Sequence, residues 1–544
     1  MLCNELYERI YQKLERKTDD ALRFAPRGTA SEILQEDAVR RFYGTIESDS
    51  LPTISEQDFV QNIIDRSLQD FLATLIFATC SYAAAVAFAT SIVATDDDDG
   101  CERKGSLPID SRHLEGIFKE KADIDRFISK QACFCAVVLQ RGQEIKIEGP
   151  AMQRLPYIEE KLRGSGDFGK VYSVKIAKGH FNHSLPELGY NSETFELARK
   201  DYTKSDEFTK GERKIMKQIL HSQSNKCENI LESYGSIEVG EMYSLFMPLA
   251  ISDLKQYMIT DNPTRPSTTD AKADIIRCAV GLAEGLNFLH TKIKTPDFDD
   301  MVCYHMDLKP SNVLIFRRED GQGNIWKLSD FGMAKVKVRR RGEMGHKEKD
   351  FNSWFLRRKQ QTEDPSVSGT ENRRFEGSYL APESIENSRL MGTKSDVWSL
   401  GCVISIVMTY LDDGKDGILR YEDMRLDHAL ADGLDRFFVR GRFKHSSPHP
   451  SVSRWHKQLV KGAQHRNMNE AKGVQMILHF LDADVFQIAP KERCDAQKIV
   501  STLQKAYISY RDATHNSDST ASSLPGRRDS SWKSLKAWIK HESK

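Results

Sequence analysis

One short stretch of this chain concentrates groups suited to phosphate chemistry. Asp307 is followed two residues later by Lys309 and five residues later by Asn312, and a second acid, Asp330, opens an Asp-Phe-Gly tripeptide. A carboxylate can accept the proton of an attacking hydroxyl, an ammonium can neutralise a moving phosphoryl group, and amide and carboxylate oxygens bind Mg²⁺. The spacing therefore predicts phosphoryl transfer with Asp307 as base, Lys309 as the neutralising charge, and Asn312 and Asp330 as metal ligands.

A glycine-rich stretch lies upstream, between two predicted strands. It has the pattern G-x-G-x-x-G-x-V and begins about 140 residues before Asp307. Glycine lets the backbone approach phosphates closely, and the amides of such a turn point towards them. The expected nucleotide contacts here are Gly164, Ser165, Gly166, Asp167, Phe168, Gly169 and Val171.

A lysine must also reach the α- and β-phosphates, and two candidates compete. Lys200 follows Ala198 with one residue between them, a pattern that sets the alanine against adenine and the lysine against phosphate. Lys175 belongs to the strand directly after the glycine turn and is the alternative. The sequence favours Lys200. Residues 179–193 contain Gly, Asn, Ser and Pro and are expected to form a loop insertion.

A predicted helix over residues 208–220 supplies a carboxylate to hold this lysine. Ile215 and Ile219 give the helix an apolar face. Glu212 is the favoured partner and Glu207 is the alternative.

The next predicted strand ends in a pattern typical of a hinge between two lobes. Met247 is expected at the back of the nucleotide pocket, and Leu249 and Ala250 at the adenine edge. Pro248 removes one backbone donor at this point. Leu314, just beyond the Asp307 motif, is a further expected nucleotide contact, and an amphipathic helix is expected over residues 275–290.

Composition restricts which partners, metal sites and cellular compartments are expected. Lysine plus arginine and aspartate plus glutamate both number 79, so no nucleic-acid partner is expected. The ten cysteines lack zinc-site spacing, even at the closest pair, Cys133 and Cys135. They are expected to be reduced thiols of an intracellular protein, which we predict to be cytoplasmic, with the nucleus as the alternative.

Together these motifs resemble the eukaryotic protein kinase family over residues 155–510. Residues 377–383 resemble the end of its activation segment, residues 394–401 resemble the start of its large buried helix, and Arg493 matches the arginine that pairs with Glu383. The resemblance implies an α+β, two-lobe kinase fold, with a β-rich small lobe at 155–250 and an α-rich large lobe at 251–510. It also implies ATP and Mg²⁺ as cofactors and a protein substrate.

The serine/threonine branch is the more similar one, because Lys309 follows Asp307 there. Ser378 stands at the position where that branch usually has threonine, and its hydroxyl is expected to bridge Asp307 and Lys309. More loosely, the chain is similar to filamentous-fungal kinase-domain proteins with a helical N-terminal region. A pseudokinase scaffold, which binds partners without catalysis, is the alternative function.

Two residues depart from the family pattern. Met306 replaces the arginine that usually grips a phosphorylated activation segment, which argues against control by such a phosphate. Arg163 stands where an aliphatic residue usually covers adenine, with Leu162 one place away.

Residues 1–150 contain helical patterns without a chemical motif. Ser55 and Asp58 resemble a capping box, and the apolar face that follows leads into residues 71–94, which carry no charge. A buried amphipathic helix continuing into an alanine-rich helix is favoured, and a transmembrane segment is the alternative. This region is expected to bind a protein partner or, less favoured, a membrane.

Three further segments are charged or polar. The stretch from Asp330 to Glu383 is rich in lysine and arginine and is expected to be a solvated insert, with a docking patch for an acidic substrate or a nuclear-import signal as the alternatives. Histidines at 445, 449, 456 and 465 are expected at the surface. Residues 512–544 form a serine-rich tail in which Trp532 and Trp538 share one helical face, suited to a membrane, a partner or the large lobe.

Overall fold

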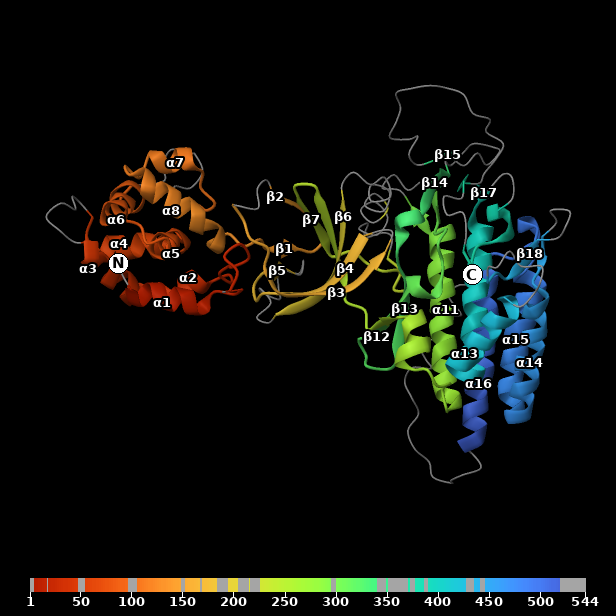
Figure 1. The fold of residues 1–544 in the computed structure, drawn as a ribbon. Helices are drawn as coiled ribbons and strands as arrows, with labels where there is room; N and C mark the ends of the chain where they lie inside the picture. Colours follow the sequence, from red (N-terminus) through yellow and green to blue (C-terminus); the bar gives the residue numbers. More distant parts are fainter. Residues whose placement is uncertain are drawn as a thin grey trace, which may run out of the picture.

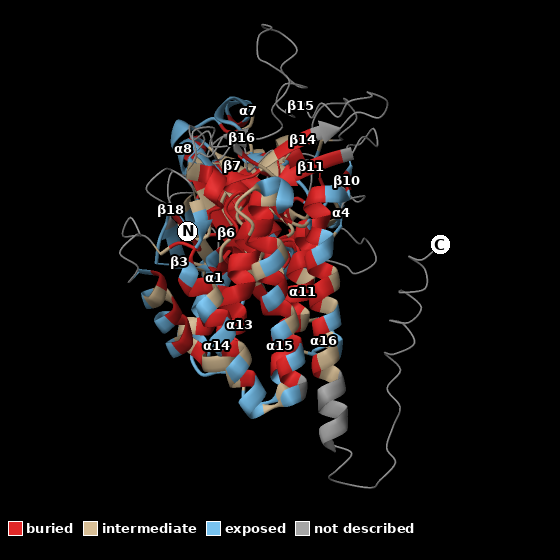
Figure 2. Cartoon of the chain, turned by 90° about the vertical axis from the view of Figure 1, so that its right-hand side faces the viewer, coloured by how far each residue is buried: buried red, intermediate tan, exposed pale blue. Residues whose placement is uncertain are grey.

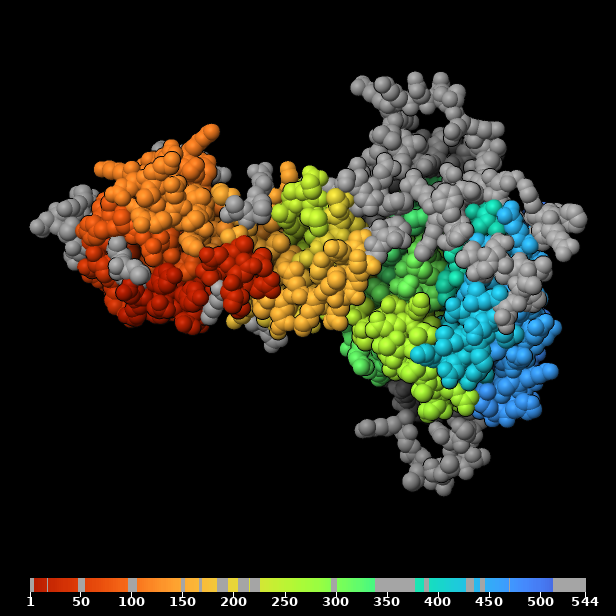
Figure 3. Space-filling model, viewed as in Figure 1, coloured from red at the N-terminus to blue at the C-terminus, as the bar shows by residue number. Residues whose placement is uncertain are grey.

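The computed structural model describes residues 4–16, 18–46, 54–95, 105–147, 152–166, 169–182, 194–203, 215, 226–294, 300–339, 349–350, 370–371, 377–385, 390–426, 435–440 and 446–518. Three parts follow one another along the molecule: an N-terminal helical region, a β-rich lobe and a helix-rich lobe (Figure 1). The β-rich lobe lies between the other two (Figure 3). The two lobes confirm the predicted α+β kinase architecture.

The N-terminal region is built from short helices around its own aromatic core. Phe71 stacks on Phe88 with ring centroids 5.1 Å apart and packs against Phe127 at 4.5 Å. The helices are α1 (Asn4–Lys13), α2 (Thr29–Ile33), α3 (Glu36–Ile46), α4 (Glu56–Asp65), α5 (Gln69–Phe77), α6 (Tyr82–Phe88), α7 (Ser111–Glu115) and α8 (Lys121–Gln131).

The long helix expected across residues 60–94 is interrupted. Ser55 caps α4 as predicted, accepting a hydrogen bond from the backbone N–H of Asp58 at 3.1 Å. However, Ser67 and Thr79 adopt φ values of 55° and 50° and end α4 and α5, because left-handed backbone cannot continue a helix. Within the described ranges, no helix is long and apolar enough to cross a membrane.

The small lobe is a six-stranded sheet with the order β2-β7-β8-β6-β4-β3. Its strands are β2 (Glu144–Ile147), β3 (Tyr157–Gly166), β4 (Gly169–Ile176), β6 (Phe195–Thr203), β7 (Gly235–Val239) and β8 (Met242–Pro248). Strand β2 pairs in parallel with β7, so the sheet begins before residue 155. Strand β1 (Leu139–Gln140) pairs separately with β5 (Phe181–Asn182). Strand β5 lies inside the predicted insertion at residues 179–193.

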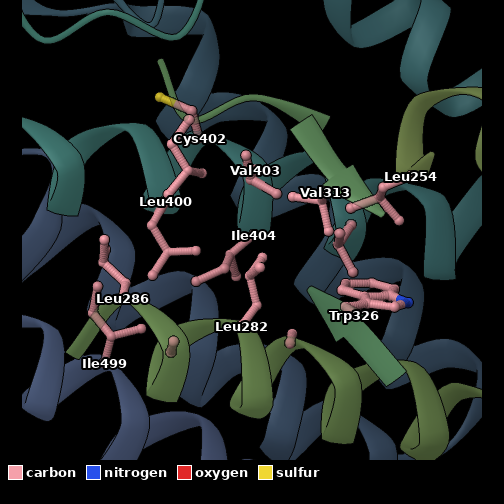
Figure 4. Packing of buried hydrophobic residues seen from close by; sticks show 14 of the residues in the cluster. Leu254, Leu282, Leu286, Val313, Trp326, Leu400, Cys402, Val403, Ile404 and Ile499 are labelled. Carbon is pink, nitrogen blue, oxygen red and sulfur yellow. The ribbon is translucent and has the colours of Figure 1, made fainter. Parts of the chain in front are cut away.

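The large lobe packs its helices around one central helix. Leu400 and Ile404 of α13 (Thr393–Leu426) face Leu286 of α11 (Thr269–Thr291) and Ile499 of α16 (Ala496–Asp518), as Figure 4 shows. Helix α11 confirms the helix expected over 275–290, but the expectation that it is amphipathic was wrong: no residue in this range is exposed, because the helix is packed on all sides within the large lobe. The remaining elements are α10 (Leu254–Gln256), α14 (Pro450–Arg466), α15 (Met468–Phe480), β9 (Ser252–Asp253), β10 (Ile293–Lys294), β11 (Asp300–Tyr304), β12 (Val313–Arg317), β13 (Asn324–Leu328), β14 (Lys335–Arg339), β15 (Lys349–Asp350), β16 (Thr370–Glu371), β17 (Leu390–Met391), β18 (Phe438–Arg440) and β19 (Ser446–Pro448).

Buried residues line the inner faces of the large-lobe helices, and exposed residues cover their outer faces (Figure 2). The expectation of surface histidines was wrong for two of the four positions. His449 is 1% exposed and His456 is 2% exposed. His456 is buried because its ring bonds Ser405 at 2.8 Å and Asp482 at 2.7 Å, which satisfies both ring nitrogens. His465 is exposed, and His445 lies outside the described residues.

Candidate active site

Strand pairing gathers the predicted nucleotide contacts of the small lobe on one face of the sheet. Lys200 lies opposite Val171, and Ala198 lies opposite Met247. Directly paired residues project to the same side, as do residues two apart along one strand. Val171, Ala198, Lys200 and Met247 therefore share a face, which is the arrangement that a nucleotide beneath the sheet requires.

Two glycines of the turn differ in how closely they are packed. Gly169 has a φ of 112°, and a Cβ there would lie 2.3 Å from the carbonyl oxygen of Asp201, so only glycine fits. A Cβ on Gly164 would meet no atom within 4 Å. Gly166 and Ser165 continue β3, while Asp167 and Phe168 lie outside the described residues.

Lys200 and Asp330 join the two lobes. The Nζ atom of Lys200 lies 3.0 Å from Oδ1 of Asp330, and the lysine is 7% exposed. Burial by itself raises the pKa of Asp330, but the neighbouring ammonium of Lys200 outweighs it, and the net pKa is below the ordinary value. Asp330 is thus held as a carboxylate, the form that can bind a cation. Glu212, the predicted partner of Lys200, lies outside the described residues.

Asp307, Lys309 and Asn312 form one hydrogen-bonded cluster. Lys309 Nζ lies 2.9 Å from Asp307 Oδ2, and Asn312 Nδ2 donates to the backbone oxygen of Asp307 at 2.7 Å and to its Oδ2 at 3.1 Å. A 3-10 turn over residues 310–312 brings the asparagine back to the aspartate. Since Nδ2 is used in these bonds, the amide oxygen is the atom that Asn312 can offer to a metal.

A buried carboxylate to which the sequence pattern gives no role anchors this loop. Asp396, at the start of α13, accepts hydrogen bonds from the backbone N–H of His305 at 2.9 Å and of Met306 at 2.8 Å. Its Oδ2 also lies 3.0 Å from Nε2 of His290 in α11. Asp396 falls inside the predicted buried-helix motif, but nothing local to that motif indicated its partners, which lie about 90 residues away.

The two halves of the site are tied together through His305. Its Nε2 lies 2.9 Å from the carbonyl oxygen of Ser329, the residue before Asp330, and its ring packs 5.1 Å from that of Phe331. Ser329 in turn donates two hydrogen bonds to the carbonyl oxygen of Asn312. Its hydroxyl lies 2.9 Å from that oxygen and its backbone nitrogen 3.0 Å from it. The predicted base and the predicted metal ligands are therefore held in one network.

Met306 packs in an apolar cluster beside the activation segment. It is 3% exposed, and its neighbours in this cluster are Val302, Tyr304, Met333, Leu380 and Met391. Ser378 lies in the adjoining turn at 377–380, and among the described residues no hydrogen bond joins it to Asp307 or Lys309. Its bridging role remains a prediction.

Glu383 and Arg493 form the buried ion pair expected from the sequence. Both nitrogens of the guanidinium fork bond the carboxylate at 2.7 Å, and Arg493 is 2% exposed. Arg493 also donates to the backbone oxygens of Gln487 and Ile488. The guanidinium group therefore has hydrogen-bond acceptors in both the Glu383 carboxylate and the backbone, and this allows its charge to remain buried.

The segment predicted to be the hinge follows the last strand of the small-lobe sheet. Strand β8 ends at Pro248, and Leu249 and Ala250 follow it, half-buried. The backbone N–H of Ile251 then donates to the carbonyl oxygen of Ile315 at 2.9 Å. Leu314, beside it in β12, packs with Leu249 against the core that runs through both lobes.

These residues suit ATP with a divalent cation. The backbone at Gly164 is unobstructed by other atoms, Lys200 supplies a cation for phosphate, and the oxygens of Asp330 and Asn312 are ligands suited to a hard metal ion. The fold and these residues are those of a protein kinase domain. The family model for the protein kinase domain matches residues 157–481, well over half of the chain, and the chain belongs to the eukaryotic protein kinase family.

Curated relatives include kinases of both hydroxyl specificities. The chain is 28% identical over 46% of its length to the probable serine/threonine-protein kinase PBL26 of Arabidopsis thaliana, covering 48% of that protein. It is 24% identical over 61% of its length to the mitogen-activated protein kinase kinase kinase YODA of the same plant, covering 30% of it. The tyrosine-protein kinase transmembrane receptor Ror of Drosophila melanogaster is also 24% identical, over 61% of this chain and 40% of the receptor. The chain thus spans less than half the length of these relatives.

Proposed function

We propose that this protein is a serine/threonine kinase that transfers the γ-phosphate of ATP to protein hydroxyls. The observation that carries the proposal is the cluster of Asp307, Lys309 and Asn312 within 3.1 Å, together with Lys200 on Asp330 at 3.0 Å. Among the described residues, the carboxylates of Asp307 and Asp330 each lie within 3.0 Å of a lysine ammonium, which supports the proposal. The Lys309 position supports the serine/threonine branch.

Each residue then has a defined role. The carboxylate of Asp307 accepts the proton of the substrate hydroxyl, and Lys309 beside it neutralises charge on the phosphoryl group in transit. Lys200 would hold the phosphates of ATP, and Asp330 and Asn312 would hold Mg²⁺, which would supply positive charge beside the transferred group. Catalysis of this kind depends on positioning, which the network through His305 and Asp396 supports.

The sharpest test is Asp307→Asn, which preserves shape and removes the base. We expect phosphate transfer to a generic protein substrate to fall about 100- to 10,000-fold, while ATP binding stays within about threefold. Asp320→Asn, at an exposed turn, is the matched control and should retain full activity. Normal turnover by Asp307→Asn would refute the assignment.

Phosphoamino-acid analysis of the product tests the hydroxyl specificity separately. Phosphoserine and phosphothreonine are the expected products, and phosphotyrosine alone would overturn the serine/threonine assignment. A pseudokinase is the second candidate, because Met306 replaces a family arginine. Absence of transfer by the wild-type protein, with intact Mg²⁺-dependent ATP binding, would favour it.

A further inference from the structure

A loop of the N-terminal region contacts the small lobe at the base of the hairpin that carries the glycine turn. The loop comprises residues 14–28, between α1 and α2, and an antiparallel bridge between Glu15 and Phe24 closes it. Leu14 and Ala30 are buried in the core of the N-terminal region, so both ends of the loop are fixed there. Figure 3 shows the N-terminal region directly against the β-rich lobe. The proposed reaction gives this contact no role.

Arg16, in this loop, bonds strand β3 at a β-bulge. Its Nη1 atom donates to the carbonyl oxygen of Ile158 at 3.2 Å. Ile158 is the extra residue of the bulge, because the residues on either side of it pair with Ile176 and Lys175, which are adjacent in β4. A bulge bends its strand, so the arginine holds β3 at the point where its direction is set. Arg16 itself has a φ of 55°, a left-handed conformation that persists in arginine only where the surrounding structure holds it.

The same loop also holds the end of β4, the second strand of the hairpin. The backbone N–H of Arg27 donates to Nε2 of His180 at 2.8 Å, and the ring of Phe24 packs edge-on against the His180 ring at 5.9 Å. Gly179, with a φ of 77°, allows this close approach, because a Cβ there would lie 3.2 Å from the Cβ of Arg27. The loop therefore contacts both strands of the hairpin at their shared base.

The base of this hairpin determines where the glycine turn lies. From Ile158 to Gly164 strand β3 extends about 20 Å. A rotation of about 5° at the bulge would therefore move the turn by roughly 2 Å. The proposed function assigns the phosphates of ATP to this turn, and a displacement of that size is large enough to weaken their contacts with it. A group that fixes the bulge can thus affect nucleotide binding without touching the nucleotide.

We propose that Arg16 is a positioning residue for ATP, and that the N-terminal helical region acts through it to hold the glycine turn over the nucleotide. Arg16 sets the angle at which β3 leaves its bulge, and the contact of Arg27 with His180 keeps the second strand in register with it. The effect on ATP rests on the proposed function, whereas the mechanical coupling of the loop to the hairpin does not. The N-terminal region then contributes to nucleotide binding, in addition to any partner that it binds.

Hydrogen exchange of the full-length protein tests the coupling without nucleotide. Arg16→Met keeps the length of the side chain and removes the donor, and we expect amide exchange in residues 157–166 to become about fivefold faster or more. Arg16→Lys keeps a donor of similar reach and should stay within about twofold of the wild type. Arg9→Met, at an exposed position of α1, is the matched control and should change nothing. Equal exchange in the wild type and Arg16→Met would overturn the proposal.

Steady-state kinetics separates positioning from a purely structural role. We expect Arg16→Met to raise the KM for ATP about threefold or more, with the KM for the protein substrate nearly unchanged, and Arg16→Lys to restore the KM for ATP. A lower melting temperature with a wild-type KM for ATP would mean that Arg16 only stabilises the fold, and it would refute the positioning role. If Arg16→Met does not fold, Gly179→Ala tests the same loop from the small lobe, because its Cβ would press against Arg27; it should raise the same KM.

Calorimetric titration with ATP and Mg²⁺ distinguishes failure of this inference from failure of the proposed function. The wild-type protein should bind ATP, and Arg16→Met should bind it about threefold more weakly or worse. Normal affinity in Arg16→Met, beside a wild-type protein that binds ATP, would refute the positioning role alone. A wild-type protein that binds no ATP would refute the proposed function and the role of Arg16 towards ATP together.

Discussion

The backbone N–H of Met306 donates to Oδ1 of Asp396 at 2.8 Å, across about 90 residues of sequence. Met306 has a φ of 64°, a conformation that costs a non-glycine residue about 1–2 kcal/mol. Asp396 offsets this cost, because the same carboxylate also binds the N–H of His305 and the ring of His290. The central helix of the large lobe therefore determines the backbone shape that positions Asp307.

Asp396→Asn tests this anchoring. The amide has one oxygen to offer two backbone donors, and its nitrogen would face an N–H group. We expect a loss of about 2–4 kcal/mol in the free energy of unfolding of the large lobe, measured by urea denaturation, together with a large fall in phosphate transfer. Asp320→Asn should stay within about 0.5 kcal/mol of the wild type. Equal stability of the two variants would show that Asp396 does not hold the loop.

Lys200→Met and Lys175→Met separate the two lysines considered from the sequence. Lys200 is 7% exposed and bonds Asp330, whereas Lys175 lies further along β4, opposite Glu196. We expect Lys200→Met to lower phosphate transfer about 100-fold or more, and Lys175→Met to change it less than about threefold. The reverse order in a radiolabelled-ATP assay would reassign the phosphate-binding lysine to 175.

Breaking the Glu383–Arg493 pair should be costly. Arg493→Met leaves Glu383 as a buried charge without its partner, and we expect a loss of about 3–5 kcal/mol in the free energy of unfolding. The double variant with Glu383→Gln should recover part of that loss, which a double-mutant cycle measures. Additive losses would mean that the two side chains do not act as a pair.

Met306 should resist substitution by the arginine common in the family. The side chain is buried among apolar neighbours, so Met306→Arg would place a charge in an apolar cluster. We expect a loss of about 3 kcal/mol or more by thermal or urea unfolding. Met306→Leu preserves the apolar volume and should cost less than about 1.5 kcal/mol. A stable arginine variant would contradict an apolar role for this position.

His180 should make the junction between the N-terminal region and the small lobe sensitive to pH. Its Nε2 accepts from the backbone N–H of Arg27 at 2.8 Å, and Nδ1 lies 2.9 Å from the carbonyl oxygen of Val137, so the ring is neutral. Burial is the main cause that lowers its pKa below 6.5, the charge of Arg27 lowers it further, and the bond to Val137 partly opposes both.

The unfolded chain therefore binds a proton at this residue more readily than the folded protein does. Stability should fall as the pH drops below about 6.5 and rise again towards pH 7.5. We expect His180→Gln to flatten this dependence of the melting temperature, whereas His113→Gln, at an exposed position, should preserve it. The same pH slope in wild type and His180→Gln would exclude His180 as the cause.

Much of the site was predictable because its key groups are close in sequence. Asp307, Lys309 and Asn312 meet within one loop, and the alternation of β6 suffices to put Ala198 and Lys200 on one face. The Glu383–Arg493 pair is distant in sequence and was nevertheless predicted, because the family resemblance carried it.

Other relationships depended on how elements pack. The parallel pairing of β2 with β7 joins residues about 90 positions apart, and no local pattern specifies it. The burial of His449 and His456 likewise depends on neighbours that the segment itself does not contain. The breaks at Ser67 and Thr79 interrupt a continuous apolar pattern, because tertiary packing outweighs the helical preference of the stretch.

The amino-acid sequence by itself determined the chemistry of this protein: which carboxylates, lysines and amides are available, and in what order along the chain. The tertiary structure alone decided how they are held, through Asp396 beneath the loop that carries Asp307 and through Lys200 on Asp330. The physical reason is range. Side-chain spacing acts over a few residues, whereas burial of a charge can be balanced only by partners that folding brings from elsewhere in the chain.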